Sequence, residues 1–385
     1  MAIPYGRQTI EDDDIAAVAD ALRHDWLTQG PQVAEFEQAF ASMVDAPYAV
    51  AFSSGTAALH GAAFAAGLGP GDELVTSGMT FAASANCGVY LGATPRFADI
   101  ERATWNVSAD TVAAALTPRT RAVIPVHFTG LPAPSAEIRS VLPEGTVVIE
   151  DAAHALGAYT ADERVGSCLY SDMAVFSLHP VKAITSGEGG IVTTRNPDLA
   201  DGLRRFRTHG LTKDPDRLEH RDEGGWHQEQ QDLGFNYRLT DFQSALGLSQ
   251  LGKLERFVSR RNEIAGRYRE LLADVNELEL PPEPPEGTRH AYHLFALRHR
   301  HGADGRRRLY DELRSREIFA QVHYIPPYLH PYYRRTFGYG EGLCPEAERY
   351  YAGCLSLPCY PLLSEEEQTL VADALVELLS SVPSR

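Results

Sequence analysis

Between about residues 50 and 195, short β-branched apolar runs alternate with helical stretches, and this alternation is the strongest constraint on the fold. "YAVAFSS" precedes "GTAALHGAAFAAGLG", and "DELVTSG" precedes "TFAASANCGVYLGA". The runs "PRFADI", "RAVIPVHF", "TVVIEDAAHALG", "DMAVFSLH" and "GGIVTT" follow at intervals that suit crossover connections. This order predicts an α/β fold with a mainly parallel sheet covered by helices.

The chain has 385 residues, of which 44% are hydrophobic, and this is enough for two cores. The helical pattern of "LTDFQSALGLSQLGKLERFVSRRNEIAGRYRELL" predicts the connection out of the sheet domain, and a Pro-rich linker, "LELPPEPPEG", follows it. Beyond the linker, "HAYHLFALR", "FAQVHYIPP" and "SEEEQTLVADALVELL" indicate a smaller α+β region whose last helix opens at Ser364. We therefore predict a large domain over residues 1–255, with an N-terminal arm, and a small C-terminal α+β domain over residues 256–385.

Composition excludes several classes of partner. The formal net charge of −17 argues against nucleic acid and against anionic membranes. The N-terminal residues do not show the basic segment followed by an apolar segment that is typical of a signal peptide. No apolar run is close to the length that spans a membrane, so we expect a cytoplasmic protein. We expect no metal site or disulfide framework, since the cysteines show no CxxC pair and suit small core positions: Cys87, Cys168, Cys344, Cys354 and Cys359.

Three polar residues stand at the ends of predicted strands. Ser54, Asp151 and Ser177 each follow an apolar run, and ligands of such sheets bind outside the carboxyl ends of the strands. In "SSGTAALH" the backbone N–H groups of Gly55 and Thr56 open a helix, which is a phosphate site or an ordinary helix cap. Ser177 can add a hydroxyl to the same phosphate. One cleft at this edge of the sheet is therefore predicted.

Asp151 and Phe81 each have two interpretations. A carboxylate buried at a strand end needs a partner, and a protonated ring nitrogen is one; a helix cap or structural salt bridge is the alternative. Phe81 begins a helix at the same edge, where it either stacks on a planar cofactor or packs in the core. Lys182 lies between "SLHPV" and a glycine-rich turn. Together with the phosphate cradle, these residues predict a pyridoxal 5′-phosphate site in which Lys182 forms a Schiff base.

The motifs "SSGTAAL", "EDAAHALGA", "FSLHPVKAITSGEGG" and "LGFNYRLTDFQSALGLSQL" resemble the sugar-nucleotide aminotransferases of the DegT/DnrJ/EryC1/StrS family. The resemblance covers nearly the whole chain and implies fold type I of the pyridoxal-phosphate enzymes, with a mainly parallel mixed sheet in a three-layer large domain. "IPYGRQTIEDDDI", "DWLTQGP", "ASANCGVYLGA", "IPVHFTG" and "QVHYIPPY" are similar to the subgroup of pseudaminic acid synthesis. Gly55 and Leu131 depart from the residues usual in that subgroup.

The resemblance assigns a role to each candidate. It implies that Lys182, once freed, shuttles a proton between the amino-acid α-carbon and the cofactor. It implies that Asp151 keeps the pyridine nitrogen protonated and that His154 lies beside the ring, unless His154 is only a satisfied polar residue of the pocket wall. The family's cofactor ligands match these positions: Ser54, Gly55, Thr56, Phe81, Asp151, Ser177 and Lys182.

Two further sets depend on the resemblance alone. Asn236 matches an asparagine that reaches the phosphate from the neighbouring subunit, which implies a homodimer with composite sites. Arg238 is a candidate for the glutamate carboxylate or the substrate, or forms a surface ion pair. The nucleotide-sugar positions, each of which can instead pack the domain interface, are Tyr5, Leu27, Thr28, Gln29, Gly30, Gln321, Val322, His323 and Tyr324.

The resemblance implies a transaminase with L-glutamate as donor and pyridoxamine 5′-phosphate as intermediate. The acceptor is expected to be the C4 keto group of a UDP-linked 4-keto-6-deoxy-N-acetyl hexosamine. Alternatives are another 3- or 4-keto nucleotide sugar linked to dTDP or GDP, and a regulatory protein that keeps the cofactor without turnover. A sugar dehydratase of the same fold carries histidine in place of the lysine, so Lys182 argues against it.

Overall fold

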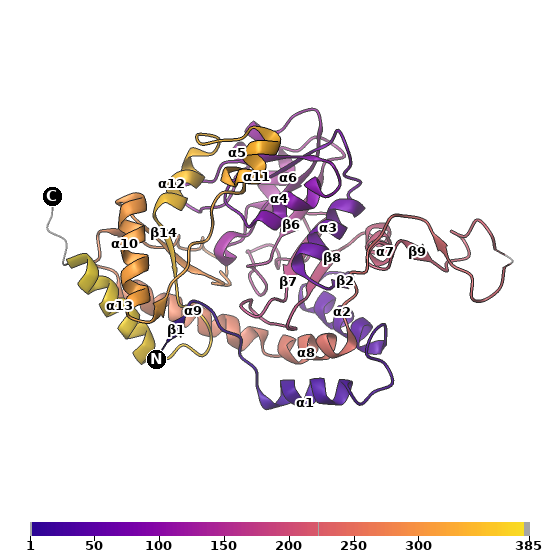
Figure 1. The fold of residues 1–385 in the computed structure, drawn as a ribbon, viewed down its shortest axis with the longest axis horizontal. Helices are drawn as coiled ribbons and strands as arrows, with labels where there is room; N and C mark the ends of the chain where they lie inside the picture. The colour runs from indigo at the N-terminus through magenta and orange to yellow at the C-terminus, as the bar shows by residue number, and fades with distance from the viewer. Residues whose placement is uncertain (1, 222, 381–385) are drawn as a thin grey trace.

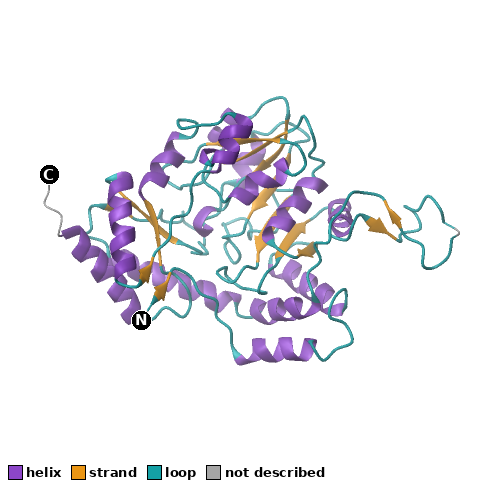
Figure 2. Cartoon of the chain, in the orientation of Figure 1, coloured by secondary structure: helices purple, strands orange, loops and turns teal. Residues whose placement is uncertain are grey.

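A seven-stranded sheet crosses the larger part of the computed structural model, which describes residues 2–221 and 223–380 (Figures 1 and 2). The spatial order of the strands is β2-β8-β7-β6-β5-β3-β4. Their bounds are Tyr48–Phe52 (β2), Glu73–Ser77 (β3), Thr94–Ala98 (β4), Thr120–Ile124 (β5), Val147–Asp151 (β6), Met173–Ser177 (β7) and Gly190–Thr194 (β8). Strand β8 is antiparallel to β2 and β7, whereas the other strand pairs are parallel, which confirms the mainly parallel, mixed sheet.

Helices cover both faces of this sheet, because successive strand residues point to opposite sides. On one face Ile149 packs with α3 (Gly55–Ala65), α4 (Ala82–Val89) and α7 (Pro197–Phe206). On the other face the β-strand valines pack with α5 (Ala109–Ala115) and α6 (Ser135–Ser140), and a further cluster includes α2 (Pro31–Met43). The predicted three-layer arrangement is confirmed.

A second sheet lies in the C-terminal region. Its antiparallel strands run in the order β11-β12-β14, with bounds Leu278–Glu279, Phe295–His299 and Cys354–Leu357. The remaining helices of this region are α10 (Gly302–Ser315), α11 (Pro331–Phe337), α12 (Pro345–Gly353) and α13 (Glu365–Ser380). Ser364 caps α13 as predicted: its Oγ accepts a 3.1 Å hydrogen bond from the Glu367 N–H.

The two regions share structural elements. Strand β1 (Ile3–Pro4) pairs in parallel with β13 (Ile318–Phe319), so the N-terminal arm lies against the C-terminal region. Helix α8 (Asp241–Leu251) packs against α1 (Asp12–Ala21) and leads into α9 (Leu254–Leu271). The first turns of α9 belong to a core cluster with β7, whereas its later turns pack on β12. The division at residue 255 stays a prediction, and α9 connects the regions on either side of it.

A hairpin formed by β9 (Leu211–Thr212) and β10 (Glu229–Gln230) extends away from the body of the molecule (Figure 1). Trp226 within it and Leu233, three residues after β10, are each 78% exposed. The five cysteines are buried and free, as predicted for core positions. No helix in the described part of the chain is both long and apolar enough to cross a membrane.

Candidate active site

Two serines meet where β2 and β7 end. Gly190, the first residue of β8, pairs with Phe52 of β2 and with Ser177 of β7. A Cβ atom at Gly190 would collide with the carbonyl group of Ser54, and one at Gly55 would lie 3.0 Å from the Ser177 Cβ. The start of α3 can approach β7 this closely because both positions are glycine. Ser54, Gly55 and Ser177 therefore form one cradle.

The first turn of α3 leaves backbone donors open. Ser54 is the N-cap, and its Oγ accepts a 3.1 Å hydrogen bond from the Ala57 N–H. The N–H groups of Gly55 and Thr56 precede that donor and have no partner within a helix. Thr56 is exposed, so these donors and the positive end of the helix dipole face outward. The cap and the phosphate interpretations are thus compatible, since the cap uses only one donor.

Asp151 ends β6 and is only 6% exposed. Its Oδ2 accepts a 2.6 Å hydrogen bond from the Ser84 hydroxyl, and its Oδ1 accepts one of 3.2 Å from the Ala153 N–H. Ser84 in turn lies 2.6 Å from the Thr80 hydroxyl, and both are buried. Ser84 was not predicted, although it stands on the same helix as Phe81, one turn further on. No cation forms an ion pair with Asp151 among the described residues.

Lys182 lies in the loop after β7, and its side chain is partly buried. Burial lowers the pKa of its amine, Asp151 raises it and Arg261 lowers it further, with a net pKa of about 8. The Lys182 Nζ lies 3.5 Å from Nε2 of His293, which precedes β12. A substantial fraction of the amine is therefore neutral near pH 8, as nucleophilic attack requires.

Two buried histidines stand beside Lys182. The ring centroids of His154 and His293 are 4.3 Å apart, and His154 Nε2 lies 3.2 Å from the hydroxyl of Tyr324. Burial and the positive charge of Lys182 hold the pKa of both imidazoles well below the ordinary value, so both are neutral. Each leaves its Nδ1 without a hydrogen-bond partner among the described residues. His293 was not predicted; its only signal was its place just before a predicted strand.

Phe81 and the C-terminal "QVHY" stretch border the same cluster. Phe81 is 56% exposed and its ring centroid lies 5.6 Å from that of Tyr324, so it is not a core residue. Gln321 exchanges two backbone hydrogen bonds with Ser356 of β14, and Val322 packs in the adjoining cores. His323 Nδ1 lies 2.8 Å from the Ser356 hydroxyl, and its ring is 5.2 Å from that of Tyr5. The structure thus brings Tyr5, His323 and Tyr324 to the edge of the cluster.

The "DWLTQG" stretch lies elsewhere within this chain. Thr28 bridges to Thr240, the Asp241 N–H donates to the Leu27 carbonyl, and the Gly30 N–H donates to Asp241 at 2.9 Å. Gln29, Gly30 and Arg238 line a cavity of about 230 Å³. No hydrogen bond in the described residues joins this group to Lys182. Leu27, Thr28 and Gly30 are thus held at the start of α8, and Gln29 and Gly30 share a cavity with Arg238.

Asn236 is exposed, and no hydrogen bond of its side chain is found in the described part of the chain. Its backbone is held firmly, because the neighbouring Tyr237 carbonyl accepts a 2.8 Å hydrogen bond from the Ser53 N–H. Tyr237 also packs against Phe235 and places its hydroxyl 3.3 Å from His60 Nδ1. Asn236 therefore presents a free amide beside the base of the protruding hairpin.

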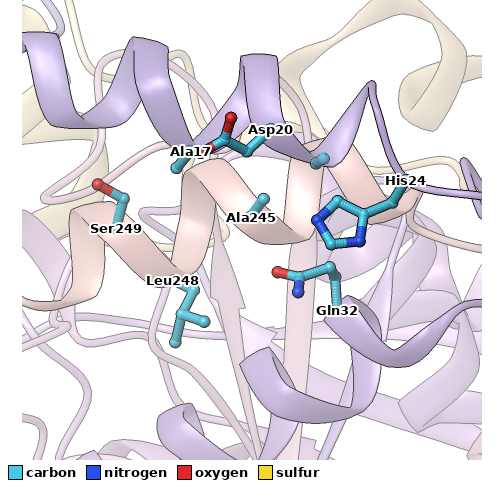
Figure 3. Close-up of a pocket in the computed structure, with 8 residues that line it drawn as sticks. Ala17, Asp20, His24, Gln32, Ala245, Leu248 and Ser249 are labelled. Carbon is cyan, nitrogen blue, oxygen red and sulfur yellow. The ribbon is translucent and has the colours of Figure 1, made fainter.

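Another cavity, of about 320 Å³, lies between α1 and α8 (Figure 3). His24 and Asp20 line it with small residues of α8, but Asp20 is paired with Arg23. The Ser249 hydroxyl that lines it donates a 2.6 Å hydrogen bond to the buried Asp14, which is paired with Lys253. No group of three or more His, Cys, Asp or Glu side chains suited to a metal ion is found in the described residues.

Comparison with known proteins identifies the family. A sequence model of the DegT/DnrJ/EryC1/StrS aminotransferase family matches residues 8–376. The chain belongs to this family. The spore coat polysaccharide biosynthesis protein SpsC of Bacillus subtilis is 39% identical over 381 residues, covering 98% of this chain and 97% of SpsC.

Solved structures of this family agree over the whole fold. Helicobacter pylori PseC, an aminotransferase of pseudaminic acid biosynthesis, superposes with a TM-score of 0.91 at 28% identity, covering 99% of this chain and 100% of PseC. The sugar aminotransferase Spr1654 of Streptococcus pneumoniae superposes in its pyridoxal-phosphate form with a TM-score of 0.92 at 27% identity, covering 100% of both chains. It has also been solved in pyridoxamine-phosphate and apo forms. This member of the DegT/DnrJ/EryC1/StrS family is accordingly a sugar aminotransferase that depends on pyridoxal phosphate.

The residues at the strand ends fit this cofactor. The free N–H groups at the start of α3 suit a phosphate, and Gly55 and Gly190 allow this helix to lie close to β7. Asp151 forms no ion pair, and a protonated ring nitrogen would supply one. Phe81 presents an exposed ring, and the His154 Nδ1 is unpartnered at the wall. Lys182 provides an amine with a pKa of about 8 at the same place.

Proposed function

We propose that the chain transfers the amino group of L-glutamate to the C4 keto group of a UDP-linked 4-keto-6-deoxy-N-acetyl hexosamine. The observation that carries the proposal is the Lys182 amine, whose pKa near 8 is set beside Asp151 and within a cluster of neutral histidines. The pseudaminic acid assignment of PseC supports the sugar class, together with its similarity over the whole chain.

We propose that the cradle at the strand ends holds the cofactor. The N–H groups of Gly55 and Thr56 and the hydroxyls of Ser54 and Ser177 bind its phosphate. Asp151 would pair with the protonated ring nitrogen, Phe81 would stack on the ring, and His154 would lie beside it. The cofactor supplies the electron sink for proton removal from the α-carbon.

In the proposed reaction Lys182 has two roles. Its neutral amine would hold the cofactor in the resting enzyme and would become free when the amino donor binds. The free amine would then remove the glutamate α-proton and hold it as an ammonium group until it is returned. In the second half-reaction the same amine moves a proton to the sugar C4 in the reverse direction. A pKa near 8 suits both roles, because the base and acid forms are each well populated.

We propose that two chains complete each site. Asn236 has an exposed amide without an intrachain hydrogen bond in the described residues, which suits a phosphate ligand for the partner subunit. The hairpin beside it and the residues after β10 expose Trp226 and Leu233, apolar surface that association would bury. Arg238 would bind the glutamate carboxylate, and Leu27–Gly30 would contact the partner's nucleotide sugar. This arrangement is compatible with the lack of a hydrogen bond between these residues and Lys182 in the described part of the chain.

In the same chain as Lys182, Tyr5 and the stretch Gln321–Tyr324 are proposed to contact the sugar nucleotide. Both lie at the rim of the histidine cluster, and Tyr324 contacts Phe81 and His154. A different 3- or 4-keto nucleotide sugar is the second candidate. It is favoured by the greater identity to SpsC, a spore coat polysaccharide protein, than to PseC: 39% against 28%.

An absorbance spectrum tests the proposal. The visible band of lysine-bound cofactor should convert to that of pyridoxamine phosphate on addition of excess L-glutamate, and a keto sugar nucleotide should restore it. Lys182→Ala should lose this conversion, whereas Lys213→Ala, which alters an exposed lysine, should keep it. A spectrum that glutamate leaves unchanged would contradict the donor, and turnover in Lys182→Ala would contradict the assignment of Lys182. Comparing UDP-, dTDP- and GDP-linked keto sugars separates the two candidate substrates.

A further inference from the structure

His293 touches Lys182 from a part of the chain that is remote in sequence. The two residues are 111 positions apart, and the 3.5 Å contact is the one hydrogen bond of the Lys182 amine among the described residues. The His293 side chain is buried, with 6% of the residue exposed. It stands in the segment before β12, which packs on α9, whereas Lys182 follows β7.

Arg261 of α9 holds this segment and the Lys182 loop together. Its guanidinium is fully buried and donates to the backbone carbonyls of Tyr292, His293 and Cys359, at 3.3, 3.3 and 2.5 Å. Its other terminal nitrogen lies 3.5 Å from the carbonyl of Val181, the residue before Lys182. No carboxylate pairs with Arg261 in the described part of the chain. Its donors are thus used to fix backbone positions on both sides of the His293–Lys182 contact.

We propose that His293 is a positioning residue that accepts a hydrogen bond from the Lys182 amine whenever that amine is not bonded to the cofactor. A neutral imidazole accepts through the nitrogen that carries no proton, so Nε2 is the acceptor and Nδ1 carries the proton. An amine that donates N–H toward His293 keeps its lone pair directed elsewhere, free for attack or for proton removal. This inference rests on the role of Lys182 in the proposed function.

If His293 were instead the donor, its loss would change the pKa of Lys182 in the opposite direction. If His293 donated from Nε2–H to the amine lone pair, it would stabilise the neutral amine and block its attack. An acceptor stabilises the ammonium form, so its loss lowers the pKa of Lys182; loss of a donor raises it. A purely structural role would let water in and also raise the pKa. The other charged or titratable groups that act on this cluster are Asp151 of β6, Arg261 of α9, and the imidazoles of His154, His290 and His323.

The chain is well suited to this measurement, because it contains only three lysines: Lys182, Lys213 and Lys253. Full-length protein freed of cofactor and labelled at the lysine ε-carbon gives three side-chain NMR signals, which the loss of one signal in Lys182→Ala and of another in Lys213→Arg assigns. The Lys182 signal should titrate with a midpoint near pH 8, whereas its carboxylate partners raise the pKa of Lys253 despite its burial.

We expect His293→Leu to lower the Lys182 midpoint by about one unit, the scale of a hydrogen bond to a charged group. His293→Gln, which keeps an acceptor, should restore the wild-type value. His290→Leu is the matched control, since His290 is equally buried in the same segment but bonds to Thr129 and Tyr292. A midpoint that stays unchanged or rises in His293→Leu would overturn the proposal.

The result is separable from the proposed function. The titration uses cofactor-free protein, so it reports on the contact whether or not Lys182 carries the cofactor. Reductive trapping of the loaded enzyme followed by peptide mapping identifies the attached lysine independently. Attachment elsewhere than Lys182, together with a lowered midpoint in His293→Leu, would overturn the proposed chemistry but not the hydrogen bond. Attachment at Lys182, together with an unchanged midpoint in His293→Leu, would support the proposed chemistry and overturn the hydrogen bond.

Discussion

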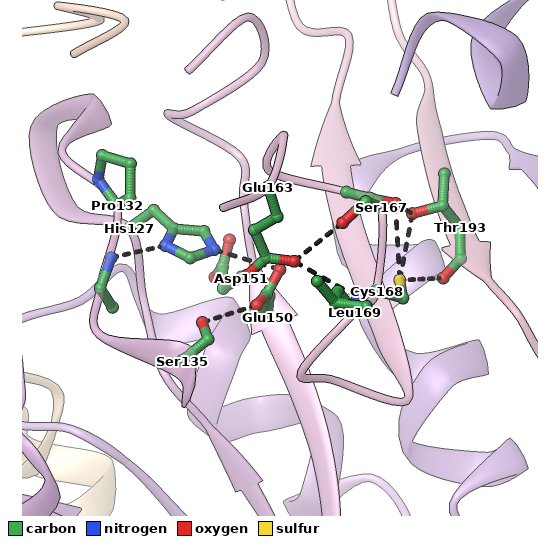
Figure 4. A network of polar contacts seen from close by, with 12 residues as sticks. His127, Pro132, Ser135, Glu150, Asp151, Glu163, Ser167, Cys168, Leu169 and Thr193 are labelled. Atoms are coloured by element: carbon green, nitrogen blue, oxygen red, sulfur yellow. Dashed lines mark hydrogen bonds and ion pairs between the residues drawn. The ribbon is translucent and has the colours of Figure 1, made fainter. Parts of the chain in front are cut away.

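Glu150 and Asp151 are consecutive residues of β6, both are buried, and the two faces of the sheet give them different surroundings. Glu150 meets partners from its own face: it accepts a 2.6 Å hydrogen bond from the Ser135 hydroxyl and lies 3.4 Å from His127 Nε2 (Figure 4). Asp151 accepts hydrogen bonds from Ser84 and a backbone N–H; it raises the pKa of the Lys182 amine but forms no ion pair in the described residues.

The comparison separates a structural carboxylate from a functional one. A buried charge is stable only when it is paired, and Glu150 finds its pair within the fold. Asp151 lies on the face where α3 begins and Lys182 follows β7, so its pair is expected to come from the cofactor. Burial alone does not distinguish a structural carboxylate from a functional one, because both are buried; their hydrogen-bond and ion-pair partners do.

The largest expected effect follows from Asp151→Asn. Amide and carboxylate have nearly the same shape, and the Ser84 hydroxyl can still donate to the amide oxygen. The loss is the negative charge that stabilises a protonated ring nitrogen, so we expect kcat for transamination to fall by at least about a hundredfold. The melting temperature of the cofactor-free protein should change little. Activity within a few-fold of wild type would break the proposed contrast with Glu150.

Glu150→Gln should show the reverse pattern. The amide cannot accept from both Ser135 and His127 as the carboxylate does, so we expect unfolding to cost about 1–3 kcal/mol less, with kcat within a few-fold of wild type. Burial raises the pKa of Glu150, but His127 and the Ser135 hydrogen bond outweigh it, and the net pKa is lowered.

The sign of the pH dependence follows from that lowered pKa. The stabilisation by Glu150 is fully present above the unfolded-state pKa of about 4.3 and is lost as the pH falls through the lower folded-state value. The stability difference between wild type and Glu150→Gln should therefore shrink as the pH falls below about 4. Denaturant unfolding at several pH values measures it, and a difference that grows in acid would contradict this account.

The sequence predicted the large-domain side of this site better than the C-terminal side. Strand periodicity and helix caps are local signals, and they placed Ser54, Asp151 and Ser177 at strand ends that the structure confirms. Ser84 and His293 were not predicted because their contacts are remote in sequence. Ser84 contacts Asp151, 67 residues away, and His293 contacts Lys182, 111 residues away. A serine in a helix or a histidine before a strand is equally compatible with ordinary packing, so the sequence alone does not reveal such a contact.

The family resemblance, by contrast, predicted substrate contacts for Leu27–Gly30 and Arg238 but not their position in the fold. Gln29, Gly30 and Arg238 line one cavity, and no hydrogen bond in the described residues joins any of the set to Lys182. Their role depends on a second chain, and no single sequence states how two copies associate. The family resemblance fixed the fold and the chemistry, while the exact sugar depends on side-chain positions at the rim.

Ser84→Ala sharpens the comparison on the side of Asp151. Removing the 2.6 Å hydrogen bond leaves the carboxylate with one fewer donor and less fixed in orientation. We expect kcat to fall about tenfold, corresponding to a hydrogen bond to a charged group. Ser135→Ala is the matched control on the other face, because it removes the equally short hydrogen bond to Glu150. It should lower stability without lowering kcat, and equal losses of kcat in both variants would remove the distinction between the faces.

Phe81→Leu gives the smallest expected effect, and it tests whether the Asp151 face holds a planar ring. Phe81 is 56% exposed, so the substitution should change stability by less than about 0.5 kcal/mol. Loss of aromatic stacking on a bound ring is expected to weaken cofactor affinity by about 1 kcal/mol, or roughly fivefold. Tyr90→Leu, at the other end of α4 and 54% exposed, is the control and should leave the affinity unchanged. Titration of cofactor-free protein measures both, and equal affinities for Phe81→Leu and wild type would show that the cofactor ring does not stack on Phe81.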